Sequence, residues 1–322
     1  MAAVTNPPFR ILCRELGAGL VVTEMISARG LAQGDKRSNA MLDIRAEEKP
    51  VCVQIFGADP ATMAAAAEVV EESGADMVDI NMGCPMKKVV KSGYGAALLR
   101  QPAEVEKMVR AMTQAVSIPV TAKIRAGWAE ANAIEVARAV EGGGGAAVTV
   151  HARTRNEMFE GHPDLDVISA LVESVSIPII GNGDVRDVSS AMSMLDQTGC
   201  HGVMVARGCM GYPWIFRELK AAFIGAPAPE APSLAERHAL LNRHIELYLE
   251  TYGEKLTCLQ IRKHLLWYFR ATPGEAVLKA NLAGLRTAQQ VFVVVAQAVE
   301  ACRRARQPFL FKKGLDRHPN RR

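Results

Sequence analysis

The first 225 residues repeat one pattern, and this repeat limits the choice of fold more than any other feature of the chain. A short β-branched apolar run, a polar loop and an Ala-rich stretch follow one another about every 25 to 30 residues, which is typical of alternating strands and helices. Because the runs are apolar almost throughout, we expect a parallel sheet covered on both faces. The seven visible runs are Leu20–Thr23, Val51–Ile55, Met77–Ile80, Val120–Ile124, Ala147–Val150, Ile177–Ile180 and Val203–Val205.

Helix signals lie between these strands. The pairs Asp-Pro and Gln-Pro open Ala-rich segments over residues 60–73 and 102–116. An open doubly wound sheet and a closed barrel share this pattern, but the even repeat and the polar residue at nearly every strand end favour a (β/α)8 TIM barrel. Residues 1–9 resemble the end of a strand and the loop after it, so we expect the first barrel strand to be truncated.

Residues 226–232 are rich in proline and predict a linker. They separate a barrel domain over residues 1–225 from a helical domain over residues 233–322, where apolar residues recur at helical spacing. Residues 226–322 carry 16 Lys and Arg against 8 Asp and Glu, whereas residues 1–225 carry 22 against 26. The C-terminal excess indicates an anionic partner such as nucleic acid, although basic tails like Lys312-Lys313 and Arg321-Arg322 are as often only solvated.

Composition and motifs exclude several other classes of protein. The chain is 49% hydrophobic and 22% charged, as globular proteins are. Its longest apolar stretches, such as Val291–Val299, are too short to span a bilayer, and the N-terminus lacks a signal peptide, so we expect a cytoplasmic protein without membrane contact. Seven scattered cysteines without a Cys-x-x-Cys pair argue against a disulfide framework and against a metal site.

Polar residues close nearly every predicted strand. In a parallel barrel the catalytic groups lie at these strand ends. Any one of them alone is as readily a cap or loop residue, but seven strand ends converging on one mouth predict an active site. The residues are Glu24, Gln54, Asn81, Lys123 with Arg125, His151 with Arg153, Asn182 with Asp184, and Arg207.

The last two strand-end loops combine small residues with a cation. They are Gly181-Asn-Gly-Asp184 and Ala206-Arg-Gly208, and barrels commonly hold a phosphate on backbone N–H groups at this place. The glycines could also serve only tight turns. Since no Gly-x-Gly-x-x-Gly opens a βαβ unit, a mononucleotide such as FMN is expected rather than a dinucleotide in a Rossmann pocket.

Cys84 is the candidate for a reacting side chain. It lies just beyond a strand end, between a glycine and a proline, and is followed by Lys87 and Lys88. A buried structural cysteine is the usual alternative. Its place in a loop beside cations, instead of an apolar run, favours a catalytic thiol.

Several motifs together carry a resemblance to a known family. In chain order they are Val-Thr-Asn-Pro-Pro-Phe-Arg, Asp-Ile-Asn-Met-Gly-Cys-Pro, Lys-Ile-Arg-Ala-Gly-Trp, Val-His-Ala-Arg-Thr-Arg, Gly-Asn-Gly-Asp and Gly-Tyr-Pro-Trp-Ile-Phe-Arg. The set covers nearly the whole chain and resembles tRNA-dihydrouridine synthases of the bacterial B type. The resemblance implies an FMN barrel, a C-terminal helical tRNA-binding domain and NADPH as reductant.

In such an enzyme reduced flavin passes hydride to C6 of uracil, and the matching cysteine gives a proton to C5. The resemblance therefore implies that Cys84 is a general acid. It implies contacts to the uridine from Asn81, Arg125 and Arg153. The flavin-binding positions that it implies are Met1, Ala2, Gln54, Lys123, His151, Asn182, Gly183, Asp184, Ala206 and Arg207.

A base within folded tRNA must be flipped out to be reduced, while basic surface holds the phosphates. Arg262 and Lys263 match the basic helix of the family, although the aromatic pair Trp267 and Tyr268 that follows fits a core equally well. Departures from the family are the short N-terminus and Ala206, where glycine is usual. The alternatives are an FMN barrel enzyme acting on a small molecule and an inactive tRNA-binding homologue. We expect a monomer.

Overall fold

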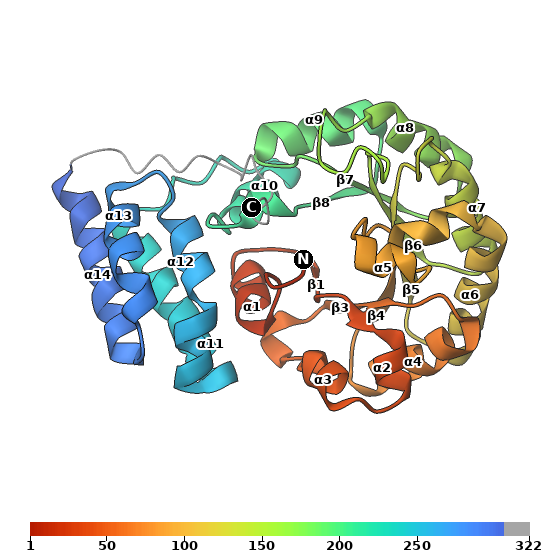
Figure 1. Cartoon of the computed structure of the whole chain (residues 1–322). Helices are drawn as coiled ribbons and strands as arrows, with labels where there is room; N and C mark the ends of the chain where they lie inside the picture. Colours follow the sequence, from red (N-terminus) through yellow and green to blue (C-terminus); the bar gives the residue numbers. More distant parts are fainter. Residues whose placement is uncertain (306–322) are drawn as a thin grey trace. The chain divides into compact units, whose positions relative to one another are not determined.

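The computed structural model describes residues 1–305, which form two compact units (Figure 1). The first unit comprises residues 1–10, 19–185 and 189–206, and the second comprises residues 11–18, 186–188 and 207–305. Every strand in the described part of the chain belongs to the first unit, whereas the second is helical.

The first unit is built on a curled sheet in which every pairing is parallel (Figure 1). Strands β3 to β8 pair in chain order, and two short strands, β1 and β2, both pair with β3. Valine, isoleucine and alanine fill most buried strand positions, as expected where both faces are covered. The strands are β1 (Val21–Val22), β2 (Ile26–Ser27), β3 (Val51–Phe56), β4 (Met77–Asn81), β5 (Val120–Arg125), β6 (Ala147–His151), β7 (Ile179–Asn182) and β8 (Gly202–Met204).

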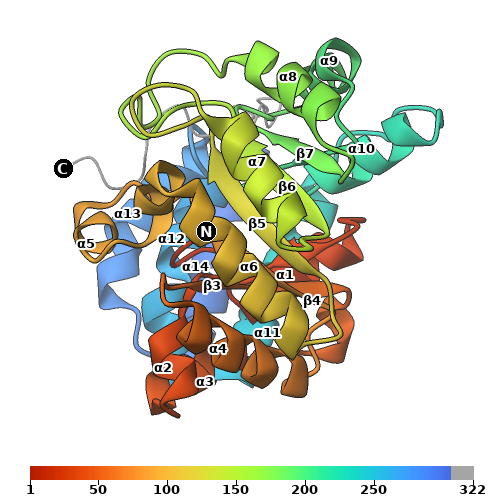
Figure 2. The same cartoon turned by 90° about the vertical axis from the view of Figure 1, so that its right-hand side faces the viewer.

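Helices cover the outer face of this sheet, and Figure 2 shows α6 and α7 side by side in front of β5 and β6. Asp59 caps α4 by accepting a hydrogen bond from the amide of Thr62, and Pro60 stands in the first turn, where its missing N–H needs no partner. In chain order the helices of residues 1–206 are α1 (Pro7–Glu15), α2 (Ala28–Ala32), α3 (Lys36–Asn39), α4 (Pro60–Glu72), α5 (Lys87–Lys91), α6 (Pro102–Ala115), α7 (Ala133–Gly142), α8 (Leu165–Ser174) and α9 (Val188–Thr198), and most of α1 belongs to the second unit.

The predicted parallel β/α barrel architecture is confirmed, as a curled sheet that stays open within residues 1–305. β1 and β8 are its edges, and no strand pairing closes the sheet between them in this part of the chain. Each predicted run coincides with a strand to within two residues. β7 starts two residues late because Pro178 has no N–H and offers only its carbonyl, which accepts from the amide of Val148 at 3.0 Å.

Two features differ from the sequence prediction. β2 was not foreseen, and it pairs with the last residues of β3. Residues 1–9 contain a turn and the start of α1 instead of a strand end. In this turn the carbonyl of Met1 accepts hydrogen bonds from the amides of Val4 and Thr5 at 3.0 and 3.1 Å, so the backbone bends back on itself.

The second unit confirms the predicted helical character over residues 233–305. Ser233 caps α11 through the amide of Glu236, and Gly253 interrupts α11 at φ 70°, a conformation that glycine adopts without strain. No helix among residues 1–305 is long and apolar enough to cross a bilayer. The helices are α10 (Ile215–Phe223), α11 (Leu234–Gln260), α12 (Arg262–Tyr268), α13 (Pro273–Asn281) and α14 (Ala288–Arg304).

The compact units divide the chain after Ala206, earlier than the predicted domain limit at residue 225. The cause is α10, which is bound to the helices that follow the linker. Arg217 pairs with Glu236 at 2.6 Å, and the indole N–H of Trp214 donates to the same carboxylate at 3.2 Å. The predicted linker, residues 226–232, contains neither helix nor strand.

A buried histidine pair lies in the core of the helical unit. His244 and His264 are 0% exposed, and their ring centroids are 4.8 Å apart. Trp267 and Tyr268 pack against these rings. Burial, with the nearby Lys263 cation, lowers the pKa of His244 to about 3 and holds that of His264 well below its usual value. Both imidazoles are therefore neutral in the folded protein at physiological pH.

This burial predicts acid sensitivity of the helical unit. Below pH 6.5 each histidine binds a proton in the unfolded chain but not in the folded one, so folding stability falls as pH falls. Replacing His264 by Phe should make that fall shallower by about 1.4 kcal/mol per pH unit. Urea unfolding followed by circular dichroism between pH 6.5 and 5 measures the slope. An unchanged slope in His264→Phe would contradict the assignment.

Candidate active site

The parallel register aligns polar side chains in rows toward the carboxyl ends of the strands. Because alternate residues face the same side of a strand, these rows share one face of the sheet. Six of the residues predicted from strand ends are brought together in this way. The first row is Gln54, Asp79 and Thr121, the second is Asn81, Lys123 and Thr149, and the third is Arg125, His151 and Asn182.

Cys84 lies in the loop after β4 and is half-buried, whereas the other six cysteines are buried. Its N–H donates to Oδ1 of Asn81 at 3.0 Å, and its carbonyl accepts from the amide of Ala96 at 3.1 Å. A Cβ at Gly95 would stand 2.8 Å from the Cys84 carbonyl oxygen, so this close approach requires glycine. Burial raises the pKa of the Cys84 thiol more than the nearby Arg125 cation lowers it. The thiol is therefore protonated at neutral pH.

Lys123 and His151 are available to a ligand. Burial and the Arg125 cation lower the pKa of Lys123 to about 7, against the opposing effect of Asp79. Its ammonium has no ion pair in the described part of the chain. Burial and the neighbouring cations lower the pKa of His151 to about 2, so the ring is neutral. Its Nδ1 atom is buried and has no hydrogen-bond partner among residues 1–305.

Arg125 ties the Cys84 loop to the segment after β6. Its Nε donates to the carbonyl of Gly83 at 2.8 Å, and its Nη1 donates to the carbonyls of Thr154 and Met158 at 2.9 and 2.8 Å. The side chain is 2% exposed. A buried guanidinium needs such acceptors, so Arg125 positions two loops besides its predicted contact with substrate.

Arg153 holds the same segment from its other end. Its Nε donates to the carbonyl of Glu160 at 2.9 Å, and its Nη2 donates to the carbonyl of Gly161 and to the carboxylate of Asp184, both at 2.6 Å. The remaining nitrogen, Nη1, is buried and has no partner in the described residues. Arg153 can therefore hold the loop through Nε and Nη2 and still donate to a ligand through Nη1.

Gly183 provides bare backbone beside His151. At φ 142°, a Cβ on this residue would stand 2.9 Å from Cβ of Pro163 and 3.3 Å from Nδ1 of His151. Its neighbour Asn182 is fixed by a hydrogen bond from Nδ2 to the carbonyl of Met204 at 2.8 Å. A side chain at Gly183 would therefore collide with Pro163, so this close approach beside His151 requires glycine.

The other predicted flavin positions lie outside the three rows. Met1 and Ala2 belong to the N-terminal turn. Ala206 is the last residue of the first unit, and Arg207 begins the following segment, which belongs to the second unit. Their predicted roles remain predictions.

Arg262 and Lys263 open α12 in the helical unit. The Arg262 guanidinium donates to the carbonyls of Cys258 and Leu285 at 2.7 and 3.1 Å, so it connects two parts of its own unit. These hydrogen bonds occupy Nε and Nη2 of the guanidinium, and the contact of Arg262 with RNA remains a prediction. The predicted basic tail, with Lys312-Lys313 and Arg321-Arg322, lies outside the described residues.

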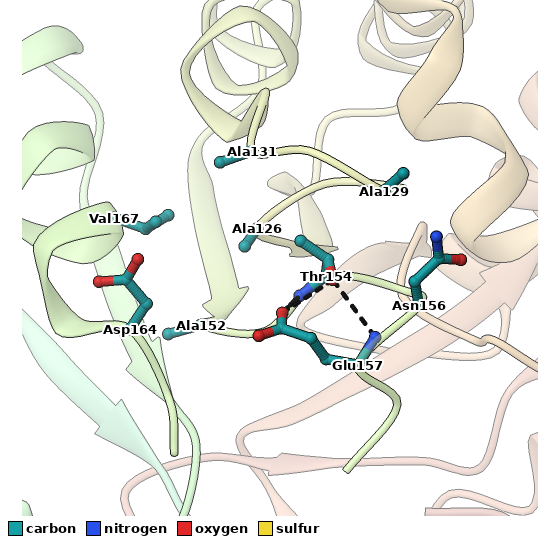
Figure 3. A pocket seen from close by; sticks show the side chains of 9 residues that line it. All are labelled: Ala126, Ala129, Ala131, Ala152, Thr154, Asn156, Glu157, Asp164 and Val167. Atoms are coloured by element: carbon teal, nitrogen blue, oxygen red, sulfur yellow. Dashed lines mark hydrogen bonds between the residues drawn. The ribbon is translucent and has the colours of Figure 1, made fainter. Parts of the chain in front are cut away.

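A cavity of about 490 Å³ lies by the ends of β5 and β6 (Figure 3). Figure 3 shows Glu157 accepting hydrogen bonds from the amide and hydroxyl of Thr154 at its rim. Cys84, Lys123 and His151 do not line this cavity, so we do not assign it as the place where the reacting groups meet. The lining residues are Ala126, Ala129, Ala131, Ala152, Thr154, Asn156, Glu157, Asp164 and Val167.

Two members of the first row, Asp79 and Thr121, were missed by the sequence reasoning. Asp79 is 5% exposed, accepts from Gln54 Nε2 and Thr121 Oγ1 at 2.8 Å each, and faces Lys123. The available signal was an acidic residue inside an apolar strand, two positions before Asn81. Residues that are two positions apart in a strand lie on the same face of the sheet. Asp79 therefore lies on the same face as Asn81, one step further from the strand end.

These features define a class of protein. The fold is a parallel β/α enzyme fold, and its strand ends gather a protonated thiol, a neutral imidazole and several cations. The family model described as dihydrouridine synthase matches residues 1–306. The chain belongs to the dihydrouridine synthase family.

Curated relatives agree over most of their length. The chain is 40% identical to tRNA-dihydrouridine synthase B of Pseudomonas putida over 291 residues, covering 90% of this chain and 86% of the relative. It is 41% identical to tRNA-dihydrouridine synthase B of Pseudomonas aeruginosa, covering 89% and 87%. It is 40% identical to a probable tRNA-dihydrouridine synthase of Mycobacterium tuberculosis, covering 89% and 77%.

Solved structures agree in fold alone. Histamine dehydrogenase from Rhizobium sp. 4-9 matches 74% of this chain with a TM-score of 0.52 at 12% identity, and 2-naphthoyl-CoA reductase matches 70% with a TM-score of 0.52 at 12% identity. The chain covers 45% and 48% of these two structures, about half of each. At this identity the likeness supports the β/α barrel architecture and nothing finer.

The backbone at Gly183 gives a test of the site geometry. Gly183→Ala should lower the free energy of unfolding by about 1–3 kcal/mol, because the new Cβ meets Pro163 and the backbone is strained for an L-residue. Gly19→Ala is the matched control, since nothing lies within 4 Å of its Cβ. Denaturant unfolding measures both. Equal effects of the two substitutions would show that Gly183 is not constrained.

Proposed function

We propose that this protein reduces uridine in tRNA to 5,6-dihydrouridine, with FMN held at the strand ends and NADPH as the reductant. The observation that carries the proposal is Cys84, a half-buried and protonated thiol in the loop beyond β4, where Lys123 and His151 share the strand-end face. Family membership and the names of the curated relatives support the same reaction.

The residues present fit FMN. Within residues 1–305 the amine of Lys123 has no ion pair and the buried Nδ1 of His151 has no hydrogen-bond partner, so both can bind a ligand. We propose that Gln54, Asn182, Asp184, Ala206 and Arg207 complete the flavin site, with Met1 and Ala2 at its border. When bound, FMN supplies the hydride that C6 of the uracil receives.

The chain itself handles the proton. Cys84 donates its thiol proton to C5, which requires a thiol and not a thiolate, and burial keeps it in that form. Lys123, whose pKa burial lowers to about 7, would supply positive charge next to bound FMN when its amine is protonated. Asn81, Arg125 and Arg153 hold the flipped uracil, and Nη1 of Arg153, which is buried and has no partner among residues 1–305, would donate to it.

We propose that tRNA is bound chiefly by positive charge of the C-terminal part. In the described helical unit much of this charge is already paired, as in Arg217 with Glu236, Arg243 with Glu15, and Lys279 with Glu275. Residues 306–322 carry six Lys and Arg and one Asp. The predictions of a monomer and of a cytoplasmic location remain predictions.

Removal of the thiol separates the two half-reactions. Cys84→Ala should leave reduction of the bound flavin by NADPH unchanged, because no proton from Cys84 enters that step. It should slow reoxidation by tRNA about 10²-fold or more, the usual contribution of a general acid. Anaerobic stopped-flow absorbance measures each step. If the variant is reoxidised by tRNA at the rate of the unaltered protein, Cys84 is not the acid.

The charge of residues 306–322 gives a second test. A chain ending at Ala305 should bind tRNA more weakly, and its slope of log Kd against log salt should decrease by up to about five, since each phosphate neutralised contributes about 0.9. Filter binding at several salt concentrations measures the slope. The full-length control with Gln in place of these six cations should match the shortened chain. An unchanged slope would place the phosphate contacts elsewhere.

A further inference from the structure

A continuous chain of hydrogen bonds joins the first row of side chains to the backbone of Cys84. Thr121 Oγ1 and Gln54 Nε2 each donate to the carboxylate of Asp79 at 2.8 Å. Asn81 Nδ2 donates to Gln54 Oε1 at 2.8 Å. The amide N–H of Cys84 donates to Asn81 Oδ1 at 3.0 Å.

We propose that Asp79 is a positioning residue: its carboxylate fixes the orientation of the Gln54 and Asn81 amides and, through them, the backbone of Cys84. The catalytic consequence of this arrangement rests on the proposed function, whereas the positioning itself does not.

The groups at the two ends of this series of hydrogen bonds, the Asp79 carboxylate and the Cys84 N–H, fix the donor and the acceptor of every bond between them. An ionised carboxylate only accepts hydrogen bonds, and a backbone N–H only donates them. Gln54 must therefore turn its NH₂ group to Asp79, which leaves its oxygen for the NH₂ group of Asn81. The oxygen of Asn81 is then left for the N–H of Cys84. A flip of either amide would set donor against donor or acceptor against acceptor, so only one arrangement satisfies every group.

Burial makes this hydrogen-bond arrangement obligatory. Asp79 is 5% exposed and Asn81 is 8% exposed, so water does not readily replace a lost partner. Burial raises the pKa of Asp79 to about 6 against the lowering effect of Gln54, Thr121 and the Lys123 cation that faces it. The carboxylate is ionised at neutral pH. Without it no acceptor orients the NH₂ group of Gln54, so Gln54 no longer holds Asn81 in place, and the hydrogen bond from the Cys84 N–H to Asn81 is weakened while the loop keeps its contacts to Ala96 and Arg125.

Alkylation of Cys84 tests this relay without any enzymatic turnover. Cys84 is half-buried and the other six cysteines are buried, so iodoacetamide reaches it first in the folded full-length protein. Asp79→Ala should release the loop, expose the thiol and return its pKa toward the ordinary value. Each unit of that fall raises the thiolate fraction, and with it the alkylation rate at pH 7.5, about tenfold. Peptide mass spectrometry measures the rate at Cys84.

Thr121→Val is the matched control. It removes the other hydrogen bond to the same carboxylate with little change in shape, but it does not lie on the route from Asp79 to Cys84. Its alkylation rate should equal that of the unaltered protein. A rate raised as much as in Asp79→Ala would mean that any disturbance of the first row releases Cys84, and would overturn the relay.

A double-mutant cycle identifies the route. Gln54→Met breaks the relay in its middle, so it should raise the rate by the same factor as Asp79→Ala, and the double variant should rise no further. Multiplied effects would show that Asp79 acts on Cys84 by another path. An unchanged rate in folded Asp79→Ala would also overturn the proposal.

Asp79→Asn covers the case in which Asp79→Ala does not fold. Its amide oxygen still accepts from Gln54 while its NH₂ donates to the Thr121 hydroxyl, so the alkylation rate of Cys84 should be normal. Gln54→Met should still show the raised rate, and a normal rate there would contradict the relay. A protein that shows these alkylation changes but forms no dihydrouridine would disprove the proposed function and leave the relay standing.

Discussion

The site depends on one constraint: charged and amide groups that are buried at the ends of parallel strands need hydrogen-bond partners for most of their polar atoms. Arg125 and Arg153 are 2% and 1% exposed, and they find theirs in the carbonyls of the segment over residues 154–161. Asp79 finds its partners in the neighbouring strands. A buried polar group without a hydrogen-bond partner lowers the stability of the fold. The loops at the strand ends therefore adopt conformations that bring their carbonyl groups to these side chains.

Burial of polar groups also explains the shifted pKa values at the strand ends. Burial first, and the neighbouring cations second, lower the pKa values of His151 and Lys123, and this keeps His151 neutral and leaves Lys123 near its point of titration. Cys84, held at its N–H and its carbonyl, remains a thiol because burial outweighs the nearby positive charge. General acid catalysis requires a protonated group in a fixed position, and a nearby cation stabilises negative charge that develops during the reaction. Cys84 and the neighbouring Arg125 have these two properties.

Much of the fold could be predicted from sequence, because apolar runs and helix caps are local signals. Val51 to Ile55 and Asp59-Pro60 each specify an element within a few residues. That the strand-end residues lie at one edge then followed from the parallel barrel, whereas the register that aligns Lys123 with Asn81 is known from the structure alone. What sequence could not give is the choice of partner for each buried group. That Arg262 binds the carbonyl of Leu285, or that α10 joins the helices after the linker through Glu236, depends on contacts between distant segments.

The most direct test of the account is whether the full-length protein makes dihydrouridine. Unmodified tRNA would be incubated anaerobically with the purified protein, FMN and NADPH, then digested to nucleosides and analysed by mass spectrometry. The account predicts that dihydrouridine appears in proportion to NADPH consumed, and that it does not appear when NADPH is omitted. Consumption of NADPH with a small-molecule enone but never with tRNA, or a protein that binds tRNA and leaves every uridine intact, would contradict it.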